Sequence, residues 1–155
     1  MVNNTITAPR GFLAAGVACG IKKSGKADLA LLVCPAGAKA ATVFTTNKIT
    51  SAAVTISKSH IKSAEIEAVV VNSGNANTCT GRQGIKNAIK MCAETAEQIE
   101  DNPHSVLVAS TGIIGEQLPI KKIVVGISKA AAKLSASASA GLDFAKAIMT
   151  TDTKP

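Results

Sequence analysis

The residues best placed for chemistry in this chain are small polar residues at the end of an apolar run. Residues 106–108 (VLV) are followed closely by Ser110, Thr111 and Gly112. Such a run predicts a buried strand, and a glycine beyond it lets a ligand approach the backbone. A Thr-Gly pair offers two backbone N–H groups and one hydroxyl, which are donors that can stabilise an oxyanion. The alternative is an ordinary strand-to-helix turn, since Pro119 follows at a position typical of a first helical turn.

Ser110 could also be a hydrolase nucleophile, which would need a histidine base and an orienting acid. His60 lies in a polar stretch, and His104 lies between a predicted helix and a predicted strand. The sequence around Ser110 lacks the glycines of a nucleophile elbow. We therefore interpret both histidines as surface residues and disfavour a Ser-His-Asp enzyme.

A second candidate site is the polar loop of residues 72–81, NSGNANTCTG. Its amide and hydroxyl groups stand between a predicted strand and a predicted helix, where they can hold a carboxylate or phosphate with help from the helix dipole. Asx turns and helix caps explain the same residues structurally. The loop has neither a Walker A lysine nor a GxGxxG pattern. Ligand contact and a structural role are both open at this point.

Two strand-loop-helix units must position these residues. Residues 68–71 predict a buried strand, and apolar residues spaced by three and four from Ile85 to Ile99 predict an amphipathic helix that stops at Asn102 and Pro103. A strand over 105–109 follows, then a helix over 119–134, a turn in the Ser/Ala stretch 135–141 and a helix over 142–149. Both candidate sites thus follow a strand and precede a helix.

The first third of the chain has a different pattern. Residues 29–33, 41–44 and 52–56 are short β-rich runs, and Pro35 and Gly37 separate the first two. This pattern predicts antiparallel strands in a hairpin or meander. The chain is therefore expected to have an α/β fold.

Composition narrows the class of protein. The 155 residues suit a single domain or a piece of a larger one, and the core must be built from Ala, Val, Ile and Leu because Trp and Tyr are absent. The net charge of +7 comes from scattered lysines without interleaved aromatic residues, which disfavours nucleic-acid binding. The absence of a signal-peptide pattern and of a run of transmembrane length predicts a cytoplasmic protein that binds no membrane.

The four cysteines show no CxxC pair and do not cluster with the two histidines. This spacing supports neither a zinc site nor a redox motif. We expect free, buried thiols in a reducing compartment.

Several motifs together carry a resemblance to a known family. In order along the chain they are PRGFLAAGVACGIKKSGKADLALLV, VFTTNKITSAAV, VVVNSGNANTCTG, VASTGIIGEQLPIKKI and AIMTTDT. The whole chain resembles the N-terminal part of the α chain of the ArgJ family. These are glutamate N-acetyltransferases, also called ornithine acetyltransferases, that cleave themselves into α and β chains.

The resemblance implies a fold and an activity. The fold would be a layered αββα sandwich of the self-processing ArgJ and DmpA-like type. The activity would be ping-pong transfer of an acetyl group from N-acetylornithine to glutamate in arginine synthesis. It would require no metal or organic cofactor, with acetyl-CoA as a further donor in bifunctional members. The nucleophile would be the threonine that begins the β chain, whose α-amine serves as its base.

The resemblance also implies roles for individual residues. Thr111 and Gly112 match the oxyanion hole, and Thr150 or Thr151 matches a substrate-binding threonine, with Thr151 favoured. Asn75 and Asn77 are candidates for shaping the site, without a catalytic role. Separately, the residue type of Asp152 suggests that it caps a turn or orients a substrate amine.

The remaining expectations concern functional residues outside residues 1–155 and two alternative functions. The cleavage motif, a substrate-binding lysine and the nucleophile are expected beyond Pro155, so residues 1–155 would be a single-domain piece that is inactive without the β chain, within a higher αβ oligomer. One alternative is an aminopeptidase or amidase of the related fold. Another is a non-catalytic module that binds small anions.

Overall fold

Four strands form one mixed sheet in the computed structural model, which describes residues 4–155. The strands are β1 (Leu13–Val17), β2 (Leu29–Ala38), β3 (Ile66–Asn75) and β4 (Val106–Ile113). The helices are α1 (Ala52–His60), α2 (Gly81–Ile99), α3 (Ile120–Ala131) and α4 (Ala138–Ile148), with a short 3-10 helix at Pro103–Ser105.

The strands lie in the order β1-β2-β3-β4. β1 pairs with β2 and β2 with β3 in antiparallel fashion, whereas β3 and β4 are parallel and are joined through α2. The carboxyl ends of β3 and β4 therefore meet at one edge of the sheet, where ligands bind in many α/β proteins. Within residues 4–155, β4 is an edge strand, and no further strand pairs with its outer side.

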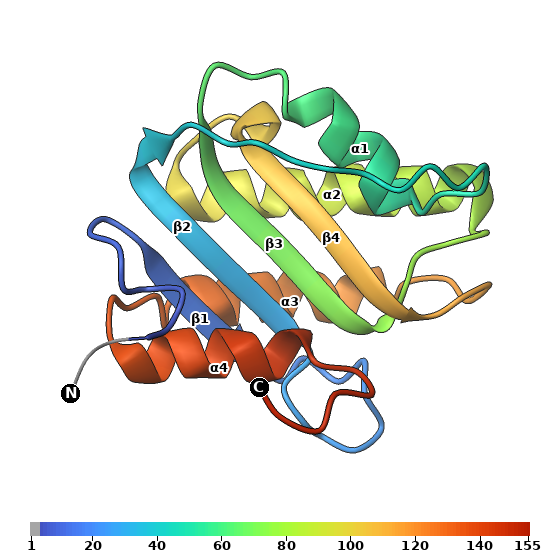
Figure 1. Cartoon of the computed structure of the whole chain (residues 1–155). Coiled ribbons are helices and arrows are strands. Elements are labelled where there is room, and N and C mark those ends of the chain that lie inside the picture. The colour runs from blue at the N-terminus through green and yellow to red at the C-terminus, as the bar shows by residue number, and fades with distance from the viewer. Residues whose placement is uncertain (1–3) are drawn as a thin grey trace.

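Helices cover the two faces of the sheet unequally (Figure 1). Residues of α1, α2 and α3 share one large core with the sheet, including the fully buried Met91, Ile123 and Ile127. α4 packs on the other face through Phe144 and Ala147. It approaches β1 so closely that a Cβ at Gly16 would lie 2.0 Å from the Asp143 carbonyl oxygen, so only glycine fits there.

The expected mixed α/β class is confirmed, and so are both strand-loop-helix units, β3 to α2 and β4 to α3. The strand predicted over 68–71 is longer than expected, because β3 continues to Asn75 through the first residues of the polar loop. The helix predicted near residue 142 begins earlier, at Ala138. At this start the Ser137 hydroxyl accepts a hydrogen bond from the backbone N–H of Ala140. A serine cap thus uses the Ser/Ala stretch to start a helix.

The strand predicted over 52–56 is wrong, because these residues begin α1. The Ser51 hydroxyl caps the helix by accepting from the Val54 N–H at 3.2 Å. The buried residues of α1 recur every three to four positions, which places one helical stripe against the core: Ala52, Ala53, Ile56, Ser57 and His60. Burial of that stripe outweighs the β propensity of the run.

Two other expectations for the first third also need correction. Residues 41–44 belong to no strand, and Val43 is 98% exposed. Pro35 and Gly37 do not separate two strands but lie inside β2, where the register with β3 is interrupted between Val33 and Ala38. A proline next to such an irregularity removes no hydrogen bond from the regular pairing of β2 with β3.

The four cysteines are free, as expected. Cys34 and Cys92 are buried and Cys19 is partly buried, whereas Cys79 is exposed, contrary to the expectation of buried thiols. Among residues 4–155, no helix combines the length and apolar character needed to cross a bilayer.

Candidate active site

The carboxyl edge of the β3–β4 pair carries the predicted oxyanion residues. Thr111 lies beside Ser73, and Gly112 lies beside Gly74, in the parallel register. Thr111 is partly buried and Gly112 is exposed. The sheet therefore holds these two residues side by side at its edge, with their outer surface open.

The outer side of β4 has a defined set of backbone groups. The Ser57 hydroxyl donates to the Val108 carbonyl at 2.7 Å and accepts from the Val108 N–H at 2.9 Å, so Val108 points away from β3. Successive residues of a strand direct their backbone groups to opposite sides. The outward set therefore continues at Ser110 and Gly112, and the Gly112 N–H points to the open edge.

Glycine is required at position 112 for two reasons. Its φ of +133° is in the region that L side chains rarely adopt, and a Cβ there would lie 2.3 Å from the carbonyl carbon of Gly74. Gly74 has a φ of +99° and itself packs against Ile21 and Lys22. The two glycines thus let the ends of β3 and β4 come together more closely than other residues would allow.

The arrangement around Ser110 argues against a serine hydrolase. The Ser110 hydroxyl donates to the Asn72 amide oxygen at 2.6 Å, and an amide oxygen is not a base. His60 is at the opposite end of β4, where its Nδ1–H donates to the Val106 carbonyl at 2.8 Å. The expectation that His60 is a surface residue is wrong, since it is only 6% exposed, whereas His104 is exposed as expected.

The segment with the predicted substrate-binding threonines begins at the same edge. The Ser73 hydroxyl donates to the Ala147 carbonyl at 2.5 Å, and the Lys22 ammonium donates to the Met149 carbonyl at 2.7 Å. Thr150 and Thr151 follow directly and are exposed. Ser73, the neighbour of Thr111 on β3, thus contacts the end of α4 that leads into these threonines.

Asp152 has a structural contact of its own. Its Oδ2 accepts a hydrogen bond from the backbone N–H of Thr150 at 2.9 Å. This is the turn-capping geometry that was one of its two predicted roles. The contact fixes the backbone on either side of Thr151.

Asn75 and Asn77 hold the polar loop together. The Asn75 amide donates to the Glu116 carbonyl, and its oxygen accepts from the Asn77 N–H at 2.8 Å. The Asn77 amide donates to the Gly84 carbonyl in α2, and its oxygen accepts from the Thr80 hydroxyl. These contacts tie the end of β3 to α2 and to the loop after β4. They support a shaping role through the loop's own conformation.

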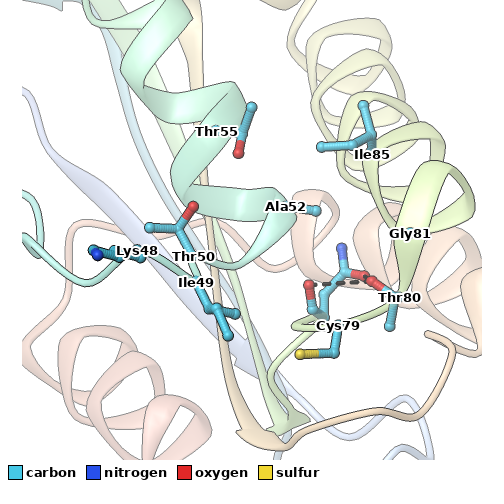
Figure 2. Close-up of a pocket in the computed structure, with 10 residues that line it drawn as sticks. Lys48, Ile49, Thr50, Ala52, Thr55, Cys79, Thr80, Gly81 and Ile85 are labelled. Carbon is cyan, nitrogen blue, oxygen red and sulfur yellow. Dashed lines mark hydrogen bonds between the residues drawn. The ribbon is translucent and has the colours of Figure 1, made fainter.

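A cavity of about 370 Å³ lies on the α1 and α2 side of the loop (Figure 2). It is lined at the amino ends of both helices by Lys48, Ile49, Thr50, Ala52, Thr55, Asn77, Cys79, Thr80, Gly81 and Ile85. The Thr80 hydroxyl donates to the Asn77 amide oxygen at 2.8 Å, so two of the lining side chains are bonded to each other. None of the lining residues belongs to β4 or α4.

Sequence reasoning missed Lys22 and Asp28 as residues of this region. Partial burial lowers the pKa of Lys22, and the nearby Asp28 carboxylate acts in the opposite direction. Burial, reinforced by Asp28, raises the pKa of the neighbouring Cys19 thiol to about 12, so this thiol is not a nucleophile. A signal was present in the sequence: Asp28 is an acidic residue directly before the apolar run 29–33.

Comparison with known proteins identifies the family of this chain. Residues 13–155 match the model of the ArgJ family. The chain belongs to the ArgJ family. It is 46% identical over 153 residues to the arginine biosynthesis bifunctional protein ArgJ of Caldanaerobacter subterraneus subsp. tengcongensis, covering 99% of this chain and 37% of that protein. It is 49% identical over 154 residues to the mitochondrial ArgJ of Lodderomyces elongisporus, covering 95% of this chain and 35% of that protein.

Solved ArgJ structures share the fold. An ornithine acetyltransferase from Mycobacterium tuberculosis, complexed with ornithine, is 38% identical and superposes with a TM-score of 0.95 over 100% of this chain and 83% of that one. The ArgJ of Bacillus halodurans gives 0.93 at 38% identity, over 99% of this chain and 79% of that one. The chain thus has an ArgJ fold but spans little more than a third of the length of its curated ArgJ relatives.

Proposed function

We propose that this chain is the α-chain portion of an acetyltransferase that moves an acetyl group from N-acetylornithine to glutamate. The support is its identity to bifunctional ArgJ proteins along nearly its whole length, and its similarity to an ornithine acetyltransferase solved with ornithine. The open edge at Thr111 and Gly112 is the local observation that carries the proposal, because it offers oxyanion donors.

The proposed reaction has two half-reactions. The threonine at the start of the β chain attacks the acetyl carbonyl of N-acetylornithine, and its own α-amine takes the hydroxyl proton. The tetrahedral intermediate collapses, the C–N bond breaks, and the protonated amine leaves as ornithine. The α-amine of glutamate then attacks the acetyl-threonine ester, giving N-acetylglutamate and the free threonine.

The residues of this chain would stabilise charge and hold substrate. The outward N–H of Gly112 and the hydroxyl of Thr111 would donate to the oxyanion that forms in each half-reaction. Thr151, or its neighbour Thr150, would contact the acetylated substrate. The rigid loop around Asn75 and Asn77 would keep the two strand ends in place.

The proposal also covers partners and location. We propose a β chain from the same precursor as the partner, in αβ units that associate further, and acetyl-CoA as a possible second donor to be assayed. A cytoplasmic location is a further prediction, which cell fractionation would test against the mitochondrial naming of the Lodderomyces elongisporus relative.

The test uses the complete gene product. Intact masses under denaturing conditions should reveal two polypeptides, of which the second begins with threonine. Purified protein should release more than one ornithine per active site from N-acetylornithine only when glutamate is present to accept the acetyl group. Release of acetate without glutamate would instead support an amidase, and a single uncleaved polypeptide without either activity would support an anion-binding module.

A further inference from the structure

Asp28 is a carboxylate with no exposed surface at the start of β2. It accepts backbone hydrogen bonds from a run of successive residues at 2.6 to 3.2 Å: Cys19, Gly20, Ile21 and Lys22. The two oxygens of this one buried side chain thus satisfy the backbone N–H groups of four successive residues. Its loss would leave all these donors unpaired, so Asp28 fixes the backbone of the segment that carries Lys22.

The Lys22 side chain extends from this fixed backbone to a distant part of the chain. Its ammonium donates to the Ala27 carbonyl at 2.8 Å and to the Met149 carbonyl at 2.7 Å. Met149 is the C-cap of α4, where the backbone becomes extended and leads into Thr150. A cation is favourable beside the carbonyl groups at a helix C-terminus. Lys22 therefore holds the point from which the threonine segment departs.

The stem of Lys22 also contacts the β3–β4 edge. A Cβ on Gly74 would lie 3.2 Å from the Lys22 Cγ, and a Cβ on Gly112 would lie 2.3 Å from the Gly74 carbonyl carbon. Lys22 thus packs over Gly74, and Gly74 packs against Gly112. One side chain links the backbone behind the oxyanion residues to the end of α4.

We propose that Lys22, anchored through Asp28, is a positioning residue that sets where residues 150–152 stand relative to Thr111 and Gly112. This inference rests on the proposed function, because it concerns the binding of the acetylated donor between these two segments. Lys22 acts through the Met149 carbonyl and touches no reacting atom. Its loss should weaken donor binding more than it slows the chemical step.

The experiment compares Lys22→Met with Lys23→Met in the full-length enzyme. Methionine keeps the stem but removes both hydrogen bonds, and Lys23 is an exposed neighbour in the same segment. Lys22→Met should raise KM for N-acetylornithine by about 10-fold or more and change kcat less, because a small misplacement of a binding group is costly. Hydrogen exchange of the amides in 148–153 should speed up in this variant only.

A purely structural role would give a different result. It would lower the active fraction, and hence kcat and Tm, with KM unchanged, and this outcome would overturn the inference. So would equal kinetics and exchange for Lys22→Met and Lys23→Met. Lys22→Arg keeps the charge and the donors with a different geometry, and is the variant to use if Lys22→Met does not fold. It should show a smaller rise in KM, and wild-type values would count against the proposal.

The inference and the proposed function fail separately. If the wild-type enzyme transfers no acetyl group, the proposed function is wrong. In that case exchange in 148–153 still reports on whether Lys22 positions the segment. If the wild type is active and Lys22→Met matches Lys23→Met, only the positioning role is wrong.

Discussion

The outer edge of β4 has two halves with the same backbone chemistry and opposite surroundings. In the first half, α1 covers the strand, and Ser57 and His60 satisfy the outward groups of Val108 and Val106. In the second half, which includes Gly112, the strand runs beyond α1 and its residues are partly or fully exposed. A buried histidine at one end of β4 therefore does not have to indicate the reactive end, which we propose is the end without a histidine. At the covered half, His60 donates a hydrogen bond to the Val106 carbonyl. At the open half, the outward N–H of Gly112 is the candidate donor.

The largest expected effect is at the open half. Gly112→Ala in the full-length enzyme should reduce acetyl transfer by at least about 1,000-fold, since it disturbs an oxyanion donor and forces the strand ends apart. Steady-state rates and thermal unfolding would be measured together. Gly115→Ala is the matched control, because Gly115 also has a positive φ but a Cβ there meets nothing within 4 Å. A similar rate for both variants would remove the special role of position 112.

Thr111→Ala should lower the rate by about 10- to 1,000-fold, the range for losing one oxyanion donor. Thr111→Ser keeps the hydroxyl and should retain most activity. Ser110→Ala is the neighbouring control, since Ser110 bonds to Asn72 and is not proposed to react. An unchanged rate for Thr111→Ala would exclude its hydroxyl from the mechanism, and abolished activity for Ser110→Ala would reinstate Ser110 as a candidate nucleophile.

At the covered half the expected effect is on stability. Ser57→Ala leaves the buried N–H and carbonyl of Val108 without their side-chain partner and should cost about 1–3 kcal/mol of unfolding free energy. Activity per folded molecule should stay at the wild-type level. Ser59→Ala, at an exposed position of the same helix, should change little. Denaturant unfolding and active-site-normalised rates would check both, and a specific loss of catalysis in Ser57→Ala would contradict the division into two halves.

The smallest expected effect comes from a carboxyl pair near the amino end of β3. A hydrogen bond with Asp101 raises the pKa of Glu67, and the same bond lowers the pKa of Asp101. The raised group stabilises the fold below its unfolded pKa and loses that effect as pH rises through its folded pKa. The lowered group stabilises above its unfolded pKa and loses that effect as pH falls through its folded pKa.

The pair therefore favours the fold most in the acidic window between those two folded pKa values. Glu67→Gln keeps a donor toward Asp101 at every pH, so Tm measured across this window should vary less than in the wild type. Glu116→Gln is the control, because Glu116 is exposed and lies at the opposite end of β3, where its carbonyl accepts from Asn75. An identical pH profile for Glu67→Gln and the wild type would show that the pair has no measurable effect on stability.

Local patterns were enough to predict the residues of the open half. The position of Thr111 and Gly112 after an apolar run is a property of neighbouring residues, and so is the helix from Gly81 to Ile99. Burial overrode local pattern at residues 52–56, where β-branched residues form a helix, and at His60, whose polar neighbours concealed its burial. The predicted roles of Thr111, Gly112, Thr150 and Thr151 stay predictions.

The contacts that assemble the site could not be predicted from local patterns. Lys22 and Met149 are 127 positions apart, and Ser73 and Ala147 are 74 apart. Each contact joins a side chain to a backbone carbonyl. Because every residue type has a backbone carbonyl, the sequence does not indicate which residue is the partner. Only the fold brings such partners together, so the sequence could indicate the candidate oxyanion residues but not the contacts that hold the end of α4 at the same edge of the sheet.

The packing of α4 on β1 has a consequence for how the chain acquires its structure. Ala14 exchanges backbone hydrogen bonds with Ser135, which lies just before α4, and Gly16 lies against Asp143 within α4. The strand β1 is thus completed by residues far along the chain. Contacts between such distant residues form slowly, because a long loop must close before they stabilise anything. During synthesis the face of β1 that α4 covers stays exposed to solvent until residue 148 has left the ribosome. The strand ends that would hold the oxyanion can assemble earlier than the helix end that would hold the substrate.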